Sequence, residues 1–278
     1  MTRERPFSAL ALDIDGTLIT SEKVITPFTR NEIVRVVRDF DLQLFLVTAR
    51  GPQSTAVIEE RLGVPASHAT YGGSVVLARH DERFETLIER PIADTSVAAI
   101  LARTMGSGAH LGVYTRDTWY VSSLGYWGLR EARNTAVWPV VKDDLAEGAT
   151  VGPVFKIMFR GETDVLESLA AELDHLSDDV YVHYTGSTIE IVSAEAVKFP
   201  AVSALSEHFG FGVDRVIAFG DTEADVGMLD NVGVGVLMAN AKSDVRVADH
   251  VERTLSHNED GIGVMLRKYF PTELPFDP

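Results

Sequence analysis

The stretch that decides the fold reads Ser8-Ala9-Leu10-Ala11-Leu12-Asp13-Ile14-Asp15-Gly16-Thr17. Its first half is short and apolar and the run stops at Gly16, which is typical of a buried strand in a parallel sheet. Asp13 and Asp15 then follow at the carboxyl end of that strand. Because residues i and i+2 point to the same face, the two carboxylates can address one centre, and Gly16 lets the backbone turn closely around it.

Taken alone, this Asp-x-Asp-Gly pattern has a second interpretation, which is a turn or a calcium-binding loop. The pattern does not continue as an EF-hand loop, because the glycine comes too early and no glutamate follows at the required spacing. The choice between a structural turn and a reactive centre therefore depends on the rest of the chain.

The segments after this run alternate between helix and strand patterns. Residues 27–40 carry apolar side chains at helical spacing behind a possible cap at Thr26, and a strand at 42–48 and a helix at 53–62 follow. This alternation predicts an α/β fold with a doubly wound parallel sheet, in which ligands bind outside the carboxyl ends of the strands. The same rhythm returns near the end, with helices expected at 199–209, 224–229 and 261–270 and strands at 215–220 and 234–238.

Residues 84–193 break this rhythm. They predict a separate α+β domain, inserted into a core domain that consists of residues 1–83 and 194–278. Lys156 lies alone in an apolar run of the insert, where it either reaches into a cleft or extends its stem along an edge strand. The elements expected in the insert are strands at 110–115, 119–122, 155–159, 180–184 and 189–192 and helices at 95–105 and 163–173.

Composition excludes several classes of function. The chain has 25 basic and 41 acidic residues, a formal net charge of −16, so we expect no nucleic acid as a partner. It has no cysteine, which excludes thiolate catalysis and cysteine-ligated metals. Without an apolar leader or a membrane-length apolar run, we expect a cytoplasmic protein with no membrane partner, as a monomer or weak dimer. The eight histidines show no local metal-ligand spacing and are expected to be structural.

Four segments far apart in sequence each place polar groups where a strand of the predicted sheet ends or, in one case, where a helix begins. Together they supply carboxylates, one hydroxyl and one ammonium group, which is what magnesium-assisted phosphoryl transfer requires. A magnesium ion and an ammonium group also offset the charge of an anionic substrate in an acidic protein. The side chains are those of Asp13, Asp15, Thr48, Lys198, Asp221 and Asp225.

These segments resemble, in order and spacing, the motifs of the haloacid dehalogenase-like (HAD) hydrolases of the Cof-type branch, subclass IIB. The resemblance spans nearly the whole chain and implies a Rossmann-like core with an inserted cap domain of the C2B type. The matching segments are Asp13-Ile14-Asp15-Gly16-Thr17, Leu46-Val47-Thr48-Ala49-Arg50, Lys198, Gly220-Asp221-Thr222-Glu223-Ala224-Asp225, Met238-Ala239-Asn240-Ala241 and Asn258-Glu259-Asp260-Gly261.

The resemblance implies a role for each of these residues. Asp13 is expected to be the nucleophile that forms an aspartyl-phosphate, and Asp15 the general acid and base. Thr48 and Lys198 are expected to hold the transferring phosphoryl group. The remaining expected sites are Ala49, Arg50 and Asn240 for phosphate or substrate, and Asp13, the backbone carbonyl of Asp15, Asp221 and Asp225 for Mg²⁺.

Three positions depart from the family pattern. Ala224 stands where Asn is usual, from which we expect altered metal affinity and not lost chemistry. Phe199-Pro200 follows Lys198 where Gly is common, and Gly72-Gly73 replaces an Asn-Gly pair, which removes one polar contact near the site.

These residues and the resemblance predict a Mg²⁺-dependent phosphohydrolase that acts on a small phosphorylated metabolite. Sugar phosphates are the substrate class that the resemblance implies. The insert would then close over the site and select the leaving group. Two alternatives remain at this point. One is a phosphomutase or phosphotransferase, in which a sugar hydroxyl replaces water as the acceptor. The other is a non-catalytic phosphometabolite-binding protein that kept the fold.

Overall fold

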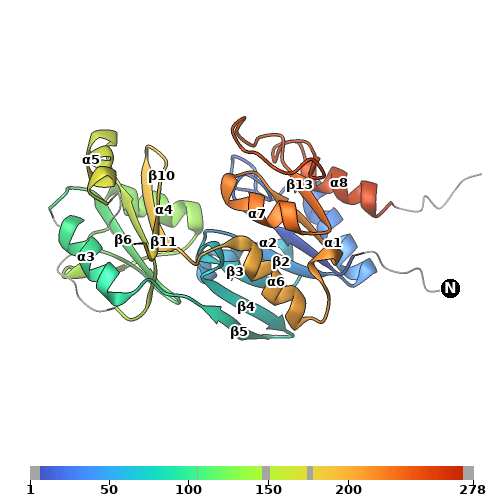
Figure 1. Cartoon of the computed structure of the whole chain (residues 1–278), viewed down its shortest axis with the longest axis horizontal. Coiled ribbons are helices and arrows are strands. Elements are labelled where there is room, and N and C mark those ends of the chain that lie inside the picture. Colours follow the sequence, from blue (N-terminus) through green and yellow to red (C-terminus); the bar gives the residue numbers. More distant parts are fainter. Residues whose placement is uncertain (1–6, 105, 146–150, 174–177, 272–278) are drawn as a thin grey trace, which may run out of the picture.

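The structure is a computed structural model that describes residues 7–104, 106–145, 151–173 and 178–271. These residues form two β-sheets with helices packed against them, and the two sheets lie side by side along the longest axis of the molecule (Figure 1). The larger sheet has eight strands in the order β14-β13-β12-β1-β2-β3-β4-β5, and the smaller has six in the order β10-β11-β9-β6-β7-β8.

The larger sheet is parallel from β14 to β3, and a hairpin adds two antiparallel strands at its edge. The first strand is buried along its whole length, as its apolar sequence predicts. The strands of this sheet are β1 (Ala9–Leu12), β2 (Gln43–Val47), β3 (Ser67–Thr70), β4 (Val75–His80), β5 (Arg83–Glu89), β12 (Val216–Gly220), β13 (Val234–Leu237) and β14 (Glu252–Arg253).

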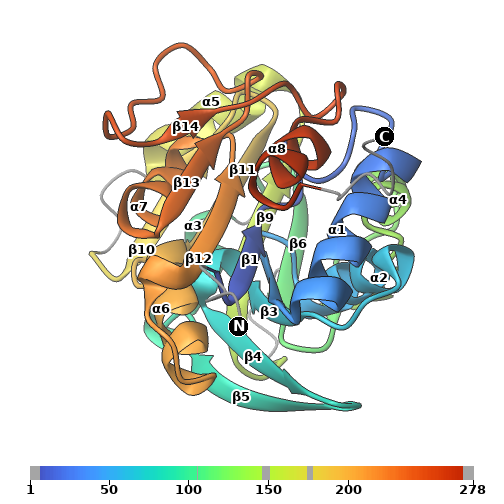
Figure 2. The same ribbon diagram turned by 90° about the vertical axis from the view of Figure 1, so that its right-hand side faces the viewer.

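Helices cover both faces of this sheet (Figure 2). On one face α1 (Pro27–Phe40), α2 (Pro52–Leu62) and α8 (Gly261–Tyr269) pack on Leu10 and Leu12 of β1. On the other face α6 (Lys198–His208) and α7 (Glu223–Asn231) pack on the alternate residues of the same strand. The predicted doubly wound α/β fold is therefore confirmed. Two short 3₁₀ turns, Tyr71–Gly73 and Val213–Arg215, complete this part.

The smaller sheet carries α3 and α5 on one face, where they enclose an apolar core of their own. Within the insert, α4 is a helix that the sequence pattern did not indicate. Residue 105, the expected end of α3, lies outside the described residues, as do residues 1–6. The elements are α3 (Asp94–Thr104), β6 (His110–Thr115), β7 (Trp119–Val121), α4 (Tyr126–Thr135), β8 (Val140–Val141), β9 (Val154–Arg160), α5 (Thr163–Leu173), β10 (Val180–Tyr184) and β11 (Thr188–Ser193).

The expected boundary after residue 83 falls at the start of β5. This strand pairs with β4 from Arg83 to Glu89, so the larger sheet continues to Glu89. An apolar cluster joins the two parts, because Tyr71 of the 3₁₀ turn stacks on Phe155 of β9 with ring centroids 6.0 Å apart. No helix among the described residues is long and apolar enough to cross a membrane.

Candidate functional site

Three neighbouring parallel strands end at one edge of the larger sheet, and each is followed by a candidate residue. Asp13 follows β1, Thr48 follows β2 and Asp221 follows β12, and β1 pairs with both of the other strands. Lys198 is the first residue of α6, which brings its side chain to the same edge. The fold therefore gathers residues from four distant segments of the chain.

The centre of the site is a buried lysine between two buried carboxylates. Lys198 Nζ donates to Asp13 Oδ1 at 2.6 Å and to Asp225 Oδ1 at 2.6 Å. Asp13 and Lys198 are each 5% exposed, and Asp225 is fully buried. Salt bridges at this depth hold their geometry because no water competes for the charged atoms.

Asp225 lies in the first turn of α7, and hydrogen bonds hold both of its carboxylate oxygens. Its Oδ2 accepts hydrogen bonds from the Asp221 and Thr222 backbone N–H groups, at 3.2 and 3.0 Å, and from the Thr222 hydroxyl at 2.8 Å. This is a capping box, with the aspartate at the third helical position satisfying free N–H groups of the helix start. Oδ1 is thereby left to face Lys198.

Asp221 follows β12 and lies close to Asp13. Its carboxylate accepts from the Thr17 hydroxyl at 3.0 Å and from the Asn240 side-chain amide at 3.1 Å, and Asn240 also donates to the Gly16 carbonyl at 2.8 Å. Gly16 has φ 84°, and any Cβ there would collide with the Asp221 carboxylate. The glycine is therefore required both for its backbone conformation and for this close approach.

Oxygens of Asp13, Asp221 and Asp225 lie within 4.8 Å of one another. Burial raises the pKa of Asp13 to about 8, against the opposing effect of Lys198, and burial also raises the pKa of Asp221 to about 6. Burial would lower the pKa of Lys198, but Asp13 and Asp225 outweigh it and raise that pKa above its usual range. The single positive charge of Lys198 therefore does not balance the negative charge of three ionised carboxylates.

A hard divalent cation fits this arrangement. Carboxylate oxygens are the ligands that Mg²⁺ prefers, and added positive charge would favour the ionised forms of Asp13 and Asp221. The three acids therefore match a magnesium ion in both donor type and charge.

Asp15 lies outside this group of carboxylates, half-exposed beside two cations. Arg50 holds it with two parallel hydrogen bonds, from Nε at 2.6 Å and from Nη2 at 2.9 Å, and Lys23 Nζ donates at 2.9 Å. Partial burial would raise the pKa of Asp15, but these two cations outweigh it and hold the pKa well below its usual range. Asp15 is ionised in this arrangement.

The loop after β2 contributes Thr48, Ala49 and Arg50. Thr48 is buried, and its hydroxyl accepts from the Arg50 backbone N–H at 3.1 Å, which leaves the hydroxyl hydrogen free to donate to a ligand. The Ala49 carbonyl accepts from Lys156 Nζ of β9 at 3.3 Å. Lys156 is 5% exposed on a central strand of the smaller sheet, so the edge-strand interpretation is wrong.

Lys23 pairs with Asp15, a contact that no motif in the sequence indicates. Lys23 also lines a cavity of about 420 Å³ between the loop that precedes α1 and the helices α1, α2 and α4. Thr17 was matched as part of a motif but given no contact, and its hydroxyl holds Asp221. The full lining of the cavity is Glu22, Lys23, Val24, Ile25, Arg30, Arg61, Arg133 and Asn134.

The three departures from the family pattern lie in helical turns at the ends of strands or the starts of helices. Ala224 is exposed in the first turn of α7, where its methyl group makes no demand on the loop. Phe199 packs its ring against the apolar cluster beneath α6, and Pro200 is accommodated in the first turn of that helix. Gly72 adopts φ 70° within the 3₁₀ turn after β3.

Comparison with known proteins gives a consistent result. The family model for haloacid dehalogenase-like hydrolases matches residues 10–266. A 5-amino-6-(5-phospho-D-ribitylamino)uracil phosphatase of Bacillus subtilis (strain 168) is 25% identical over 267 residues, which cover 94% of either chain.

Solved structures show the same fold. A haloacid dehalogenase-like hydrolase from Bacteroides thetaiotaomicron superposes with a TM-score of 0.85 at 23% identity, over 95% of this chain and 100% of that one. A sugar phosphatase of HAD subclass IIB superposes with a TM-score of 0.74 at 20% identity, over 94% of this chain and 98% of that one. The chain therefore belongs to the haloacid dehalogenase-like hydrolases, in the Cof-type branch, where its named relatives are phosphatases.

Proposed function

We propose that this phosphatase removes the phosphoryl group from a small phosphorylated metabolite through a covalent intermediate on Asp13, with Mg²⁺ as cofactor. The observation that carries the proposal is the group of three carboxylates, two of which are paired with one buried lysine, at the edge where the parallel strands end. Asp13, Asp221 and the backbone carbonyl of Asp15 would hold the ion, with Asp225 beside them. When bound, the ion supplies positive charge against the phosphoryl oxygens.

In the first step an Asp13 carboxylate oxygen attacks phosphorus, and the bond from phosphorus to the leaving oxygen breaks. Lys198 and the Thr48 hydroxyl would donate to the phosphoryl oxygens and stabilise their charge; in support, Lys198 contacts Asp13, and the Thr48 hydroxyl hydrogen is free to donate. The leaving oxygen takes a proton from Asp15. In the second step a water molecule gives a proton back to Asp15 and attacks phosphorus, which breaks the acyl-phosphate bond and frees Asp13.

Asp15 must change partners to act as an acid. While Arg50 and Lys23 hold it, the carboxylate is ionised and suits only the second step, in which it accepts a proton. A substrate whose polar groups draw Arg50 and Lys23 away would let Asp15 take up the proton needed in the first step. Coupling between leaving-group binding and acid catalysis is the expected result.

We propose that the insert, residues 84–193 in the sequence-based division, acts as the cap that selects the leaving group. Lys156 of β9 already contacts the loop that carries Thr48 and Arg50. The cavity beside Lys23 is lined by four basic side chains and one acidic one, which favours a polar or anionic leaving group such as a sugar. A phosphorylated sugar or polyol is therefore the proposed substrate class.

The test is release of inorganic phosphate from p-nitrophenyl phosphate and from a panel of sugar phosphates, with and without Mg²⁺. We expect release only with Mg²⁺, a loss of at least about 10³-fold in Asp13→Asn, and no change in the matched control Asp244→Asn, an exposed aspartate. Release that is unaffected by Asp13→Asn would overturn the proposal. Transfer of phosphate to a second sugar hydroxyl, without free phosphate, would identify a phosphomutase instead.

A further inference from the structure

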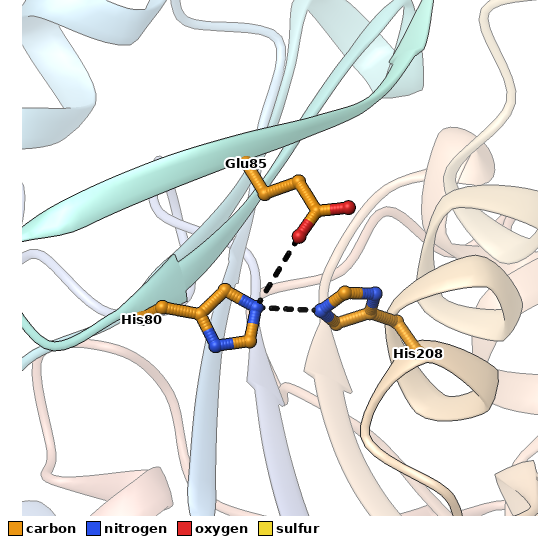
Figure 3. A group of neighbouring side chains, drawn as sticks. All are labelled: His80, Glu85 and His208. Atoms are coloured by element: carbon orange, nitrogen blue, oxygen red, sulfur yellow. Dashed lines mark hydrogen bonds and ion pairs between the residues drawn. The ribbon is translucent and has the colours of Figure 1, made fainter.

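A second group of possible metal ligands lies on the side of the larger sheet where the parallel strands begin, away from Asp13. His80 is the last residue of β4, Glu85 belongs to β5, and His208 is the last residue of α6. Strand β4 runs antiparallel to β3, and α6 begins at Lys198. Both elements therefore start beside the candidate active site and end on the side of the sheet away from it. Their three side chains point toward one another (Figure 3).

The three side chains bring two imidazole nitrogens and one carboxylate oxygen close together. His80 Nε2 lies 2.7 Å from His208 Nε2 and 3.7 Å from a Glu85 carboxylate oxygen. One ligand atom from each residue lies within 4.8 Å of the other two. Two neutral imidazoles can share one hydrogen bond across 2.7 Å. The Glu85 carboxylate faces the same His80 nitrogen and takes no part in that hydrogen bond.

We propose that His80, Glu85 and His208 bind a divalent transition metal ion of the zinc class, with water completing the coordination. Two imidazole nitrogens, each about 2.0–2.1 Å from a tetrahedral ion, lie about 3.3 Å apart, so the pair has to open by about 0.6 Å. His80 and Glu85 are exposed at the surface and the opening needs only side-chain rotation. The carboxylate supplies the negative charge.

Ligand chemistry separates this site from the acidic one. Imidazole nitrogen favours zinc, nickel, copper or cobalt, whereas Mg²⁺ prefers oxygen ligands and retains its water. His208 also stands at the end of α6, where the free carbonyl groups of the helix favour a cation. The two sites thus select different ions from the same solution.

A bound ion would tie the β4–β5 hairpin to α6. These elements already touch through the helix face that packs on β4 and β5, and the ring of His80 lies against those of His208 and Phe209. Lys198 and His208 are the first and last residues of one helix of 11 residues, about 15 Å apart along its axis. The metal would therefore stabilise the helix that presents Lys198 without touching the substrate.

The experiment is a calorimetric titration of the full chain with Zn²⁺ in excess Mg²⁺, repeated with Co²⁺ and followed by visible absorption. We expect one equivalent of zinc per chain and a cobalt spectrum of tetrahedral type. His208→Gln and Glu85→Gln should weaken binding at least about tenfold, because even the loss of an outer partner of a metal ligand costs about 10–100-fold. His183→Gln, an exposed histidine of β10, is the matched control and should bind as the parent does.

Thermal unfolding provides a second readout. At a zinc concentration 100 times the dissociation constant, Tm should rise by about 5 °C in the parent and in His183→Gln, but not in His208→Gln. Mg²⁺-dependent phosphate release by His208→Gln should equal that of the parent, which shows that the variant is folded. No zinc binding, or equal zinc affinity in the parent, Glu85→Gln and His208→Gln, would overturn the proposal.

Discussion

Replacing Lys198 by methionine removes the only positive charge that touches Asp13 and Asp225 among the described residues, while preserving most of the side-chain volume. Two buried carboxylates would then face each other and Asp221 without a cation. The substitution therefore tests whether the lysine is needed for the fold as well as for phosphoryl transfer.

The magnitude follows from the two contacts. When Asp13 and Asp225 are ionised, each lies 2.6 Å from Lys198, and at an effective dielectric constant of about 20 each pair contributes about 6 kcal/mol before desolvation is subtracted. The cost of burying Lys198 offsets much of this, and breaking a buried pair typically lowers the free energy of unfolding by about 3–5 kcal/mol. We expect Lys198→Met to lose about that amount in the absence of Mg²⁺, and phosphatase activity to fall at least about 10²-fold.

The assay is urea unfolding followed by far-UV circular dichroism, with and without Mg²⁺. All three tryptophans of the chain, Trp119, Trp127 and Trp138, lie in the insert, so their fluorescence follows the insert and serves as an internal control. The midpoint measured by circular dichroism should fall more than the midpoint measured by fluorescence. Mg²⁺ should stabilise the variant more than the parent, because the acidic group has one positive charge fewer.

A double variant sharpens the test. Asp13→Asn in the Lys198→Met background removes one of the unpaired charges and should recover about 1–3 kcal/mol of the loss. The reasoning fails if Lys198→Met unfolds within 0.5 kcal/mol of the parent, about the spread expected of surface substitutions, or if Asp13→Asn destabilises it further.

Three more outcomes follow from the structure. Gly16→Ala should weaken Mg²⁺ activation at least about tenfold, measured as the Mg²⁺ concentration for half-maximal activity, since the new methyl group displaces the Asp221 carboxylate. Lys156→Met should raise KM for sugar phosphates more than it lowers kcat, because the contact is remote from phosphorus. Burial would raise the pKa of Glu59, but the hydrogen bond and charge of His68 outweigh it and lower that pKa. Its stabilising effect is therefore present above its ordinary pKa and is lost as the pH falls through the lower folded pKa, so Glu59→Gln should flatten the decline of Tm on the acid side of the ordinary pKa of Glu59.

The parallel core was predictable because its local signals agree. Helix α1 begins and ends where the sequence indicates, with Thr26 capping its N-terminus and Asp41 in the left-handed conformation at its C-terminus. Strands such as β1 are buried on both faces and read as short apolar runs. The clustering of Asp13, Thr48 and Asp221 then followed from the rule that parallel strands end at one edge.

Strand β5, helix α4 and the histidine pair have no comparable pattern in the sequence. Strand β5 lies at the edge of the sheet with its first four residues exposed, so its sequence carries no alternating apolar pattern. Helix α4 buries only Gly128, Glu131 and Ala132, of which just one is a typical core residue. The approach of His80 to His208, 128 residues apart, depends on where a strand and a helix end, which local spacing does not encode.

Three hydrogen bonds join the insert to the loops of the larger sheet and would oppose any opening between the two parts. Lys156 to Ala49, Tyr71 to Thr115 and Gln53 to Asp117 each cross between the two parts. At about 1 kcal/mol net for each, these three contacts by themselves would limit any open form to about 1% of the molecules, before the apolar cluster is counted. A metabolite that enters only the open form would lose about a hundredfold in apparent affinity, unless its own contacts replace those three.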